Sequence, residues 1–108
     1  MDPVALHQNS IVIDGHCDTV MAVLDGKRKM VERSSEGHVD LPRLREGGVT
    51  AQVFAMFIEN QYLPAGAAKQ TLRMLDALYG ELEANADSFV LATKAGHIEQ
   101  AKAGGKIA

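Results

Sequence analysis

The sequence predicts a parallel α/β fold, and three observations lead to that prediction. Two short apolar runs are separated by a helix-start signal, a long amphipathic segment follows the second run, and a Gly-Gly turn precedes the beginning of another apolar run. Strands that alternate with helical segments are typical of parallel sheets with crossover connections. The chain has no internal repeat and no low-complexity linker, so we predict one segment, residues 1–108, without a separate second domain.

Both predicted strands are apolar without polar alternation. The first spans residues 10–14 and the second spans residues 49–58. Continuous apolar strands suit a parallel sheet that is covered on both faces, so we expect both strands to be buried. Between them, residues 19–37 are mostly polar and have one weak apolar patch, which predicts a long, partly mobile loop.

Capping signals define the first helix, and periodicity defines the second. Asp40 is placed to cap free first-turn amides, Pro42 is tolerated in a first turn, and Gly47-Gly48 ends the helix. The spacing of apolar residues by three and four predicts a helix over 65–86. We expect this stripe, with Met74 at its margin, to pack against the sheet. It consists of Ala68, Leu72, Leu75, Tyr79, Leu82 and Ala86.

The last twenty residues predict one more helix and the entry to a third strand. Residues 89–92 favour a brief extended stretch, and Thr93 is placed to cap a helix that continues to Ala103. Gly104-Gly105 ends that helix, and residues 106–108 resemble the first residues of a strand.

Composition excludes several classes of protein. The chain is 46% hydrophobic and 23% charged with a formal net charge of -3, and its only compact basic cluster, Lys27-Arg28-Lys29, is typical of a solvated loop. This gives no basic surface for nucleic acid. The longest apolar run, residues 53–58, is far shorter than the roughly 20 residues of a membrane span, so we expect no membrane partner. The first residues of the sequence do not resemble a signal peptide, and Cys17, as the single cysteine, forms no internal disulfide. Both observations favour a cytoplasmic location. We expect Cys17 to be a small buried hydrophobic residue.

The first strand is followed by a His-x-Asp pattern that suits a metal site. Alternate residues of an extended chain point the same way, so the imidazole of His16 and the carboxylate of Asp18 are expected to converge while Cys17 faces elsewhere. Zinc binds imidazole nitrogen and carboxylate oxygen, and it needs further ligands from other strand ends. The alternative is a plain turn in which Asp18 caps a helix. Asp14 is either a residue that orients His16 or a turn-initiating aspartate.

Two motifs together resemble the N-terminal part of the membrane (renal) dipeptidase family of zinc metallopeptidases. They are Asp14-Gly15-His16-x-Asp18 and His38-Val39-Asp40-Leu41-Pro42-Arg43-Leu44-x-x-Gly47-Gly48-Val49-x-Ala51-Gln52. The resemblance implies a (β/α)8 barrel of the metal-dependent hydrolase (amidohydrolase-like) type, with two zinc ions and dipeptide substrates that are hydrolysed by a metal-activated water. It implies that His16 and Asp18 are ligands of one metal. The bridging glutamate and the other ligands are expected beyond Ala108, so this segment is an incomplete barrel, has no catalytic residue and is expected to be inactive alone.

Weaker candidates and a competing function remain open. Gln52 is either close to the substrate site or, as we prefer, makes a structural hydrogen bond to a neighbouring strand. Glu59 follows the carboxyl end of the second strand, where barrel enzymes have their active sites. The ordinary polarity of a loop explains Glu59 equally well. We expect neither His38 nor His97 to bind metal. The competing function is a non-catalytic α/β module that associates with itself or a partner through exposed strand edges. Oligomer formation, or association with the rest of a barrel, is expected in either case.

Overall fold

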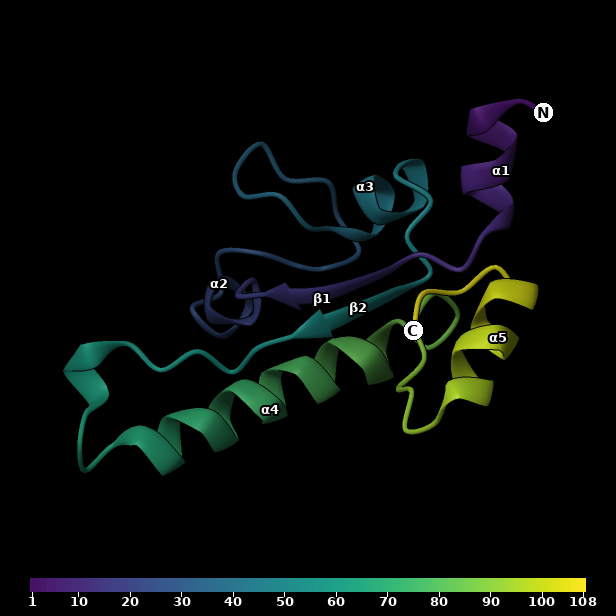
Figure 1. Ribbon diagram of the computed structural model, residues 1–108. Helices are drawn as coiled ribbons and strands as arrows, with labels where there is room; N and C mark the ends of the chain where they lie inside the picture. Colours follow the sequence, from purple (N-terminus) through teal and green to yellow (C-terminus); the bar gives the residue numbers. More distant parts are fainter.

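The computed structural model describes all of residues 1–108, which form helices around a two-stranded parallel sheet (Figure 1). The two strands run side by side through the middle of the molecule, with α3 on one side of them and the long α4 along the other (Figure 1). None of the helices combines the length and the hydropathy that crossing a bilayer requires. The elements are α1 (Pro3–Asn9), β1 (Ile13–Cys17), α2 (Val20–Leu24), α3 (Leu41–Glu46), β2 (Ala51–Phe54), the 3-10 helix η1 (Asn60–Tyr62), α4 (Ala67–Ala84) and α5 (Ala95–Ala103).

The sheet confirms the predicted parallel pairing and the beginning of a third strand. β1 and β2 are parallel neighbours, and Ile13 lies opposite Ala51. On the other edge of β2, the N–H of Ala108 donates to the carbonyl of Thr50, and the N–H of Gln52 donates to the carbonyl of Ala108. Phe89 and Ile107 form a further parallel bridge, which confirms the extended stretch near residues 89–92.

The strands differ from the prediction in position and burial. β1 begins and ends three residues later than the expected 10–14, and β2 covers only four of the expected ten residues. β1 is largely exposed, with 53% of Ile13 accessible, and Val53 of β2 is 51% accessible. The prediction of burial on both faces is therefore wrong for these residues, because a strand is buried on both faces only where other elements cover both.

The segment 19–37 is more ordered than the sequence indicates. It contains α2, whose Val20 is fully buried and which packs against α4. Further along, Met30 is 2% exposed; its N–H donates to the Glu81 carboxylate of α4, and its carbonyl accepts the N–H of Leu41 at the start of α3. The prediction of a loop is wrong for Val20–Leu24, which forms a helix, and no other helix or strand occurs in the segment.

Short-range signals position α3 as predicted. Asp40 is the N-cap, and its carboxylate accepts the N–H of Arg43 at 3.0 Å. Gly47 is the C-cap, and Gly48 has a φ of 71°, a conformation that residues with a Cβ rarely adopt. The ring of His7 lies against Gly48, and its Nε2 makes a 2.7 Å hydrogen bond to the carbonyl of Gly47, which attaches α1 to the end of α3.

The long helix is confirmed, but its buried face matches the expected stripe only in part: Leu82 of that stripe packs against the buried core. α4 spans 18 of the predicted 22 residues. Met74, expected at the margin, is fully buried, whereas Leu72 and Tyr79 of the predicted stripe are 66% and 50% exposed. Several apolar residues lie outside the buried face, so periodicity alone did not identify the side that packs.

The helices at the two ends of the chain also differ in detail. α5 begins at Ala95 with Lys94 as its N-cap, so the predicted cap, Thr93, is wrong. The backbone N–H of Thr93 donates to Nδ1 of His97 at 3.1 Å. α1 was not predicted, although its start has a clear signal: the carboxylate of Asp2 accepts the N–H of Val4, and Pro3 is the first helical residue.

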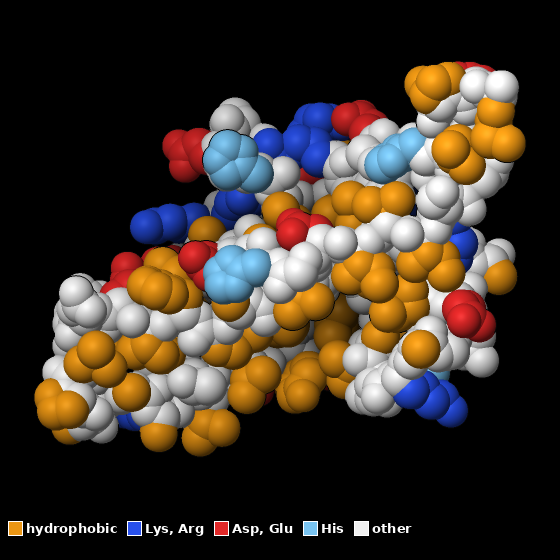
Figure 2. Space-filling model, in the orientation of Figure 1, with side chains coloured by type: hydrophobic (Ala, Val, Ile, Leu, Met, Phe, Trp, Pro, Cys, Tyr) orange, Lys and Arg blue, Asp and Glu red, His pale blue; other side chains and the backbone are white.

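The buried core is small and lies beside a large apolar groove. Five residues form the core cluster, namely Met30, Leu41, Leu44, Phe89 and Ile107. A cavity of about 380 Å³ opens between β2, α4 and the chain from residue 89 to α5, and 16 of its 17 lining residues are hydrophobic. Figure 2 shows hydrophobic side chains around a hollow on this face. We call this cavity the apolar groove; its walls include Val53, Leu78, Tyr79, Leu91 and Ile98.

Candidate metal-binding site

His16 and Asp18 converge as the sequence predicts. Nε2 of His16 and Oδ1 of Asp18 are 3.0 Å apart, at the carboxyl end of β1. Both side chains are accessible, at 67% and 47%, whereas the intervening Cys17 is half-buried and therefore faces elsewhere. A nitrogen and an oxygen donor are thus presented together to solvent at a strand end.

A register shift of the β-bulge type lies in β1 between Asp14 and Cys17, beside the pair. Asp14 lies opposite Gln52 and Cys17 lies opposite Phe54, so three residue steps on β1 face two steps on β2. The extra residue lies at Gly15 or His16. A bulge re-aims the side chains near it, and a glycine inside a strand is a known signal for one. The sequence prediction treated Asp14-Gly15 as the end of the strand and missed this feature.

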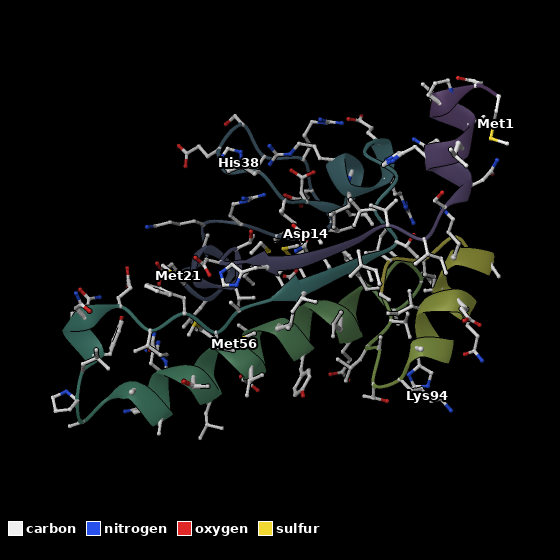
Figure 3. The ribbon with its side chains drawn as sticks, viewed as in Figure 1. Met1, Asp14, Met21, His38, Met56 and Lys94 are labelled. Atoms are coloured by element: carbon white, nitrogen blue, oxygen red, sulfur yellow. The ribbon has the colours of Figure 1, made fainter.

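The residues around the bulge set its local polarity. The carboxylate Oδ1 of Asp14, which lies on β1 in the middle of the molecule (Figure 3), accepts the backbone N–H of His16 at 3.3 Å. Burial raises the pKa of the Cys17 thiol, and hydrogen bonds to Thr19 only partly oppose this effect. Cys17 is therefore held as a neutral thiol rather than as a thiolate, in line with the small hydrophobe expected, although it is only half-buried.

The weaker candidates lie apart from this pair. Gln52 is 7% exposed, and its Nε2 donates to the carbonyl of Val53 in its own strand, not to a neighbouring strand as preferred. Glu59 is exposed and accepts a hydrogen bond from Gln61. His38 lies on the loop before α3, away from β1 (Figure 3), and Nδ1 of His97 is used by Thr93.

The donor set fits a metal ion in kind and falls short in number. Imidazole and carboxylate are both ordinary zinc donors, and zinc takes at least three protein ligands. No group of three or more His, Cys, Asp or Glu side chains in the structure is placed to hold a metal ion. His16 and Asp18 therefore provide two donors of a larger set.

Arg28 is the residue that the sequence prediction misplaced most. It was assigned to a solvated basic loop, yet its side chain is 6% exposed, and Nη2 donates to the carbonyl of Val39 and lies 3.6 Å from the carboxylate of Asp40. Gly37 has a φ of 64° and leaves room beside Nη1 of Arg28. Arg28, Asp40 and Arg43 thus form a buried charge cluster. Its one signal in the sequence is the N-cap Asp40 followed by Arg43, whose Nε donates to the Asp40 carboxylate.

Comparison with known proteins identifies the family. A family model described as membrane dipeptidase, peptidase family M19, matches residues 2–108. The chain belongs to the membrane dipeptidase family. This confirms the resemblance on which the sequence prediction depended, over nearly the whole chain.

One solved structure of a membrane dipeptidase relative shares the fold. It is the crystal structure of dipeptidase AC, described as a metallopeptidase of family M19, and it is 26% identical to this chain with a TM-score of 0.76. The match covers 90% of this chain and 32% of that chain, so this chain spans about a third of the length of the solved relative.

Proposed function

We propose that this chain is the part of a zinc-dependent dipeptidase that contributes the first two ligands of a metal site, His16 and Asp18. The observation that supports the proposal is the 3.0 Å approach of the His16 imidazole and the Asp18 carboxylate at the end of β1, in a chain of the membrane dipeptidase family. The substrates that follow from the family are dipeptides, and the reaction is hydrolysis of their amide bond.

The architecture that we propose for the whole enzyme is a (β/α)8 barrel. β1, β2 and the strand that begins near Ile107 would be its first three strands, because all of them run parallel and are joined by helical crossovers. Barrel enzymes place their chemistry at the carboxyl ends of the strands, which is where His16 and Asp18 lie. The solved relative, of which this chain matches 32%, is long enough for the remaining strands.

The role of this chain in that reaction is to hold the metal ion through His16 and Asp18. His16 would bind metal through a ring nitrogen and Asp18 through a carboxylate oxygen. Zinc bound there would supply an acidified water and polarise the scissile carbonyl. The structure has no group of three or more metal-binding side chains, and two donors hold zinc weakly, so we infer that the chain alone does not turn over dipeptides.

The test combines a zinc-loaded assay with a binding measurement. The 108-residue chain is incubated with zinc and a panel of dipeptides, and hydrolysis is followed by release of free amino acids. We expect weak zinc binding that disappears in His16→Ala, and no hydrolysis. Robust turnover that is abolished by His16→Ala would contradict the inference that the chain supplies only part of a site, while zinc binding that is indifferent to both His16→Ala and Asp18→Asn would contradict the ligand assignment.

A second candidate, a non-catalytic module that associates through its open surfaces, has one observation in its favour. The apolar groove and the exposed strand residues Ile13 and Val53 leave a hydrophobic surface that favours association. Zinc separates the two candidates, because a module of this kind should associate to the same extent with and without the metal.

A further inference from the structure

The register shift in β1 lies directly beside the candidate metal site. β1 and β2 pair regularly up to Asp14, and pairing resumes at Cys17, whose carbonyl accepts the N–H of Ala55 at 2.8 Å. The extra residue of a bulge is left out of the ladder, so strand pairing alone does not fix the backbone at residues 15–16. A local hydrogen bond to the N–H of His16 can fix it.

The acceptor is the side chain of Asp14. Its Oδ1 lies 3.3 Å from the His16 nitrogen, which closes a two-residue side-chain turn over Gly15. This single hydrogen bond joins the last regularly paired residue of β1 to the residue whose imidazole reaches Asp18. The backbone from Asp14 to His16 sets the direction in which the His16 ring leaves the strand.

Asp14 is not itself placed to be a third donor. It does not combine with His16 and Asp18 into a group of three side chains that could hold a metal ion. Its carboxylate oxygen is instead directed at the backbone of His16. The contact through which Asp14 can orient His16 is this hydrogen bond, and the Asp14→Asn variant separates its effect from that of the carboxylate charge.

We propose that Asp14 is a positioning residue: its carboxylate fixes the bulged turn that aims the imidazole of His16 at Asp18. The proposal rests on the proposed function for its meaning, since the pair that it aligns is the candidate metal-binding pair. Outer residues that orient a ligand commonly change metal affinity by about 10- to 100-fold when they are removed. The hydrogen bond needs an acceptor oxygen and not a charge, so asparagine can replace Asp14.

The experiment compares Asp14→Ala, Asp14→Asn and the control Asp76→Ala in the full 108-residue chain. Asp76 is exposed on α4 and has no side-chain partner in the structure, so its removal leaves β1 unchanged. Two quantities are measured by NMR on ¹⁵N-labelled protein. One is the exchange rate of the His16 amide hydrogen without metal, relative to its intrinsic rate; the other is the apparent dissociation constant for zinc at the His16 resonances. Urea midpoints verify that each variant is folded.

We expect Asp14→Ala to speed exchange at His16 several-fold and to weaken zinc binding by about tenfold. Asp14→Asn and Asp76→Ala should match the unsubstituted chain in both quantities. Unchanged exchange and affinity in Asp14→Ala would overturn the proposal, and so would an asparagine variant that behaves like the alanine variant. If the unsubstituted chain takes up no zinc at His16, the proposed function fails, while exchange at His16 still decides whether Asp14 holds the turn.

Discussion

Asp40 is a buried carboxylate that accepts three hydrogen bonds and pairs with two arginines, Arg28 and Arg43. It is fully buried, and its carboxylate accepts hydrogen bonds from Nε of Arg43 and from the backbone N–H groups of Ser34 and Arg43. Burial alone would raise the pKa of Asp40, but these hydrogen bonds, first that of the Arg43 side chain, outweigh it and lower the pKa from 3.8 to about 2. The carboxylate thus attaches the segment between α2 and α3 to the first turn of α3.

Replacing this carboxylate should destabilise the fold. Asp40→Asn keeps the capping oxygen but leaves Arg28 and Arg43 without their counter-charge, so we expect the free energy of unfolding to fall by about 3 kcal/mol. Urea denaturation measures the loss. Asp2→Asn is the matched control, since Asp2 is an exposed N-cap and asparagine caps equally well. Equal stability of the two variants would contradict the role of Asp40.

The same carboxylate predicts an acid dependence of stability. Because its pKa is lower in the folded chain than in the unfolded chain, its contribution is complete above the ordinary value of 3.8 and is lost as the pH falls toward 2. The unsubstituted chain should lose about 2 kcal/mol more than Asp40→Asn as the pH drops from about 5 to about 2. Unfolding free energies of the two proteins across this range provide the measurement. Parallel pH profiles would contradict the lowered pKa.

Single residues show which features sequence patterns could and could not predict. The cap at Asp40 and the convergence of His16 and Asp18 depend on neighbours within four residues, and both are present. The burial of Arg28 depends on a partner eleven residues away, and the register shift in β1 depends on pairing with another strand. Local patterns do not encode such contacts.

At the level of elements, α4 shows how an apolar pattern can mislead. Its existence and extent follow from helical spacing, which is a local property. Its buried face depends on α2, a helix from a segment that the sequence predicted to be a loop. Met74 is therefore fully buried, although the predicted stripe placed it at the margin of the buried face.

Two substitutions on α4 distinguish its faces. Met74→Ala should lower the free energy of unfolding by about 3 kcal/mol, because it leaves a cavity at a fully buried position. Leu72→Ala, from the predicted stripe, should change it by less than about 0.5 kcal/mol, because Leu72 is 66% exposed. Thermal or urea unfolding of both variants measures the difference. A larger cost at Leu72 would restore the face that the sequence predicted.

The whole molecule is less compact than its length would allow. Its radius of gyration is 14.9 Å, against about 13 Å for a globular chain of this size, and only 14 of 108 residues are buried. The apolar groove lies between elements that elsewhere would enclose a core. Fold class could be predicted from the order of strands and helices, but this open surface could not, because it depends on how the elements assemble.

An open groove of this kind should bind apolar molecules and promote association. We expect the native chain to bind a hydrophobic dye and to self-associate as its concentration rises. The double substitution Tyr79→Lys with Leu91→Lys should weaken both effects. Its cost in stability should be small, because both side chains line the groove and are half-exposed. Dye fluorescence and sedimentation provide the measurements. Leu72→Lys, exposed on the same helix but outside the groove, is the control. A chain that stays monomeric and binds no dye would contradict the expectation.

The central claim is that His16 and Asp18 together bind a divalent metal, and a zinc titration followed at the histidine resonances tests it most directly. Zinc should perturb the ring signals of His16, with the effect lost in His16→Ala, strongly reduced in Asp18→Asn and retained in His38→Ala, whose histidine is exposed elsewhere. Zinc that leaves the His16 signals unchanged, or binds equally well without either side chain, would contradict the account.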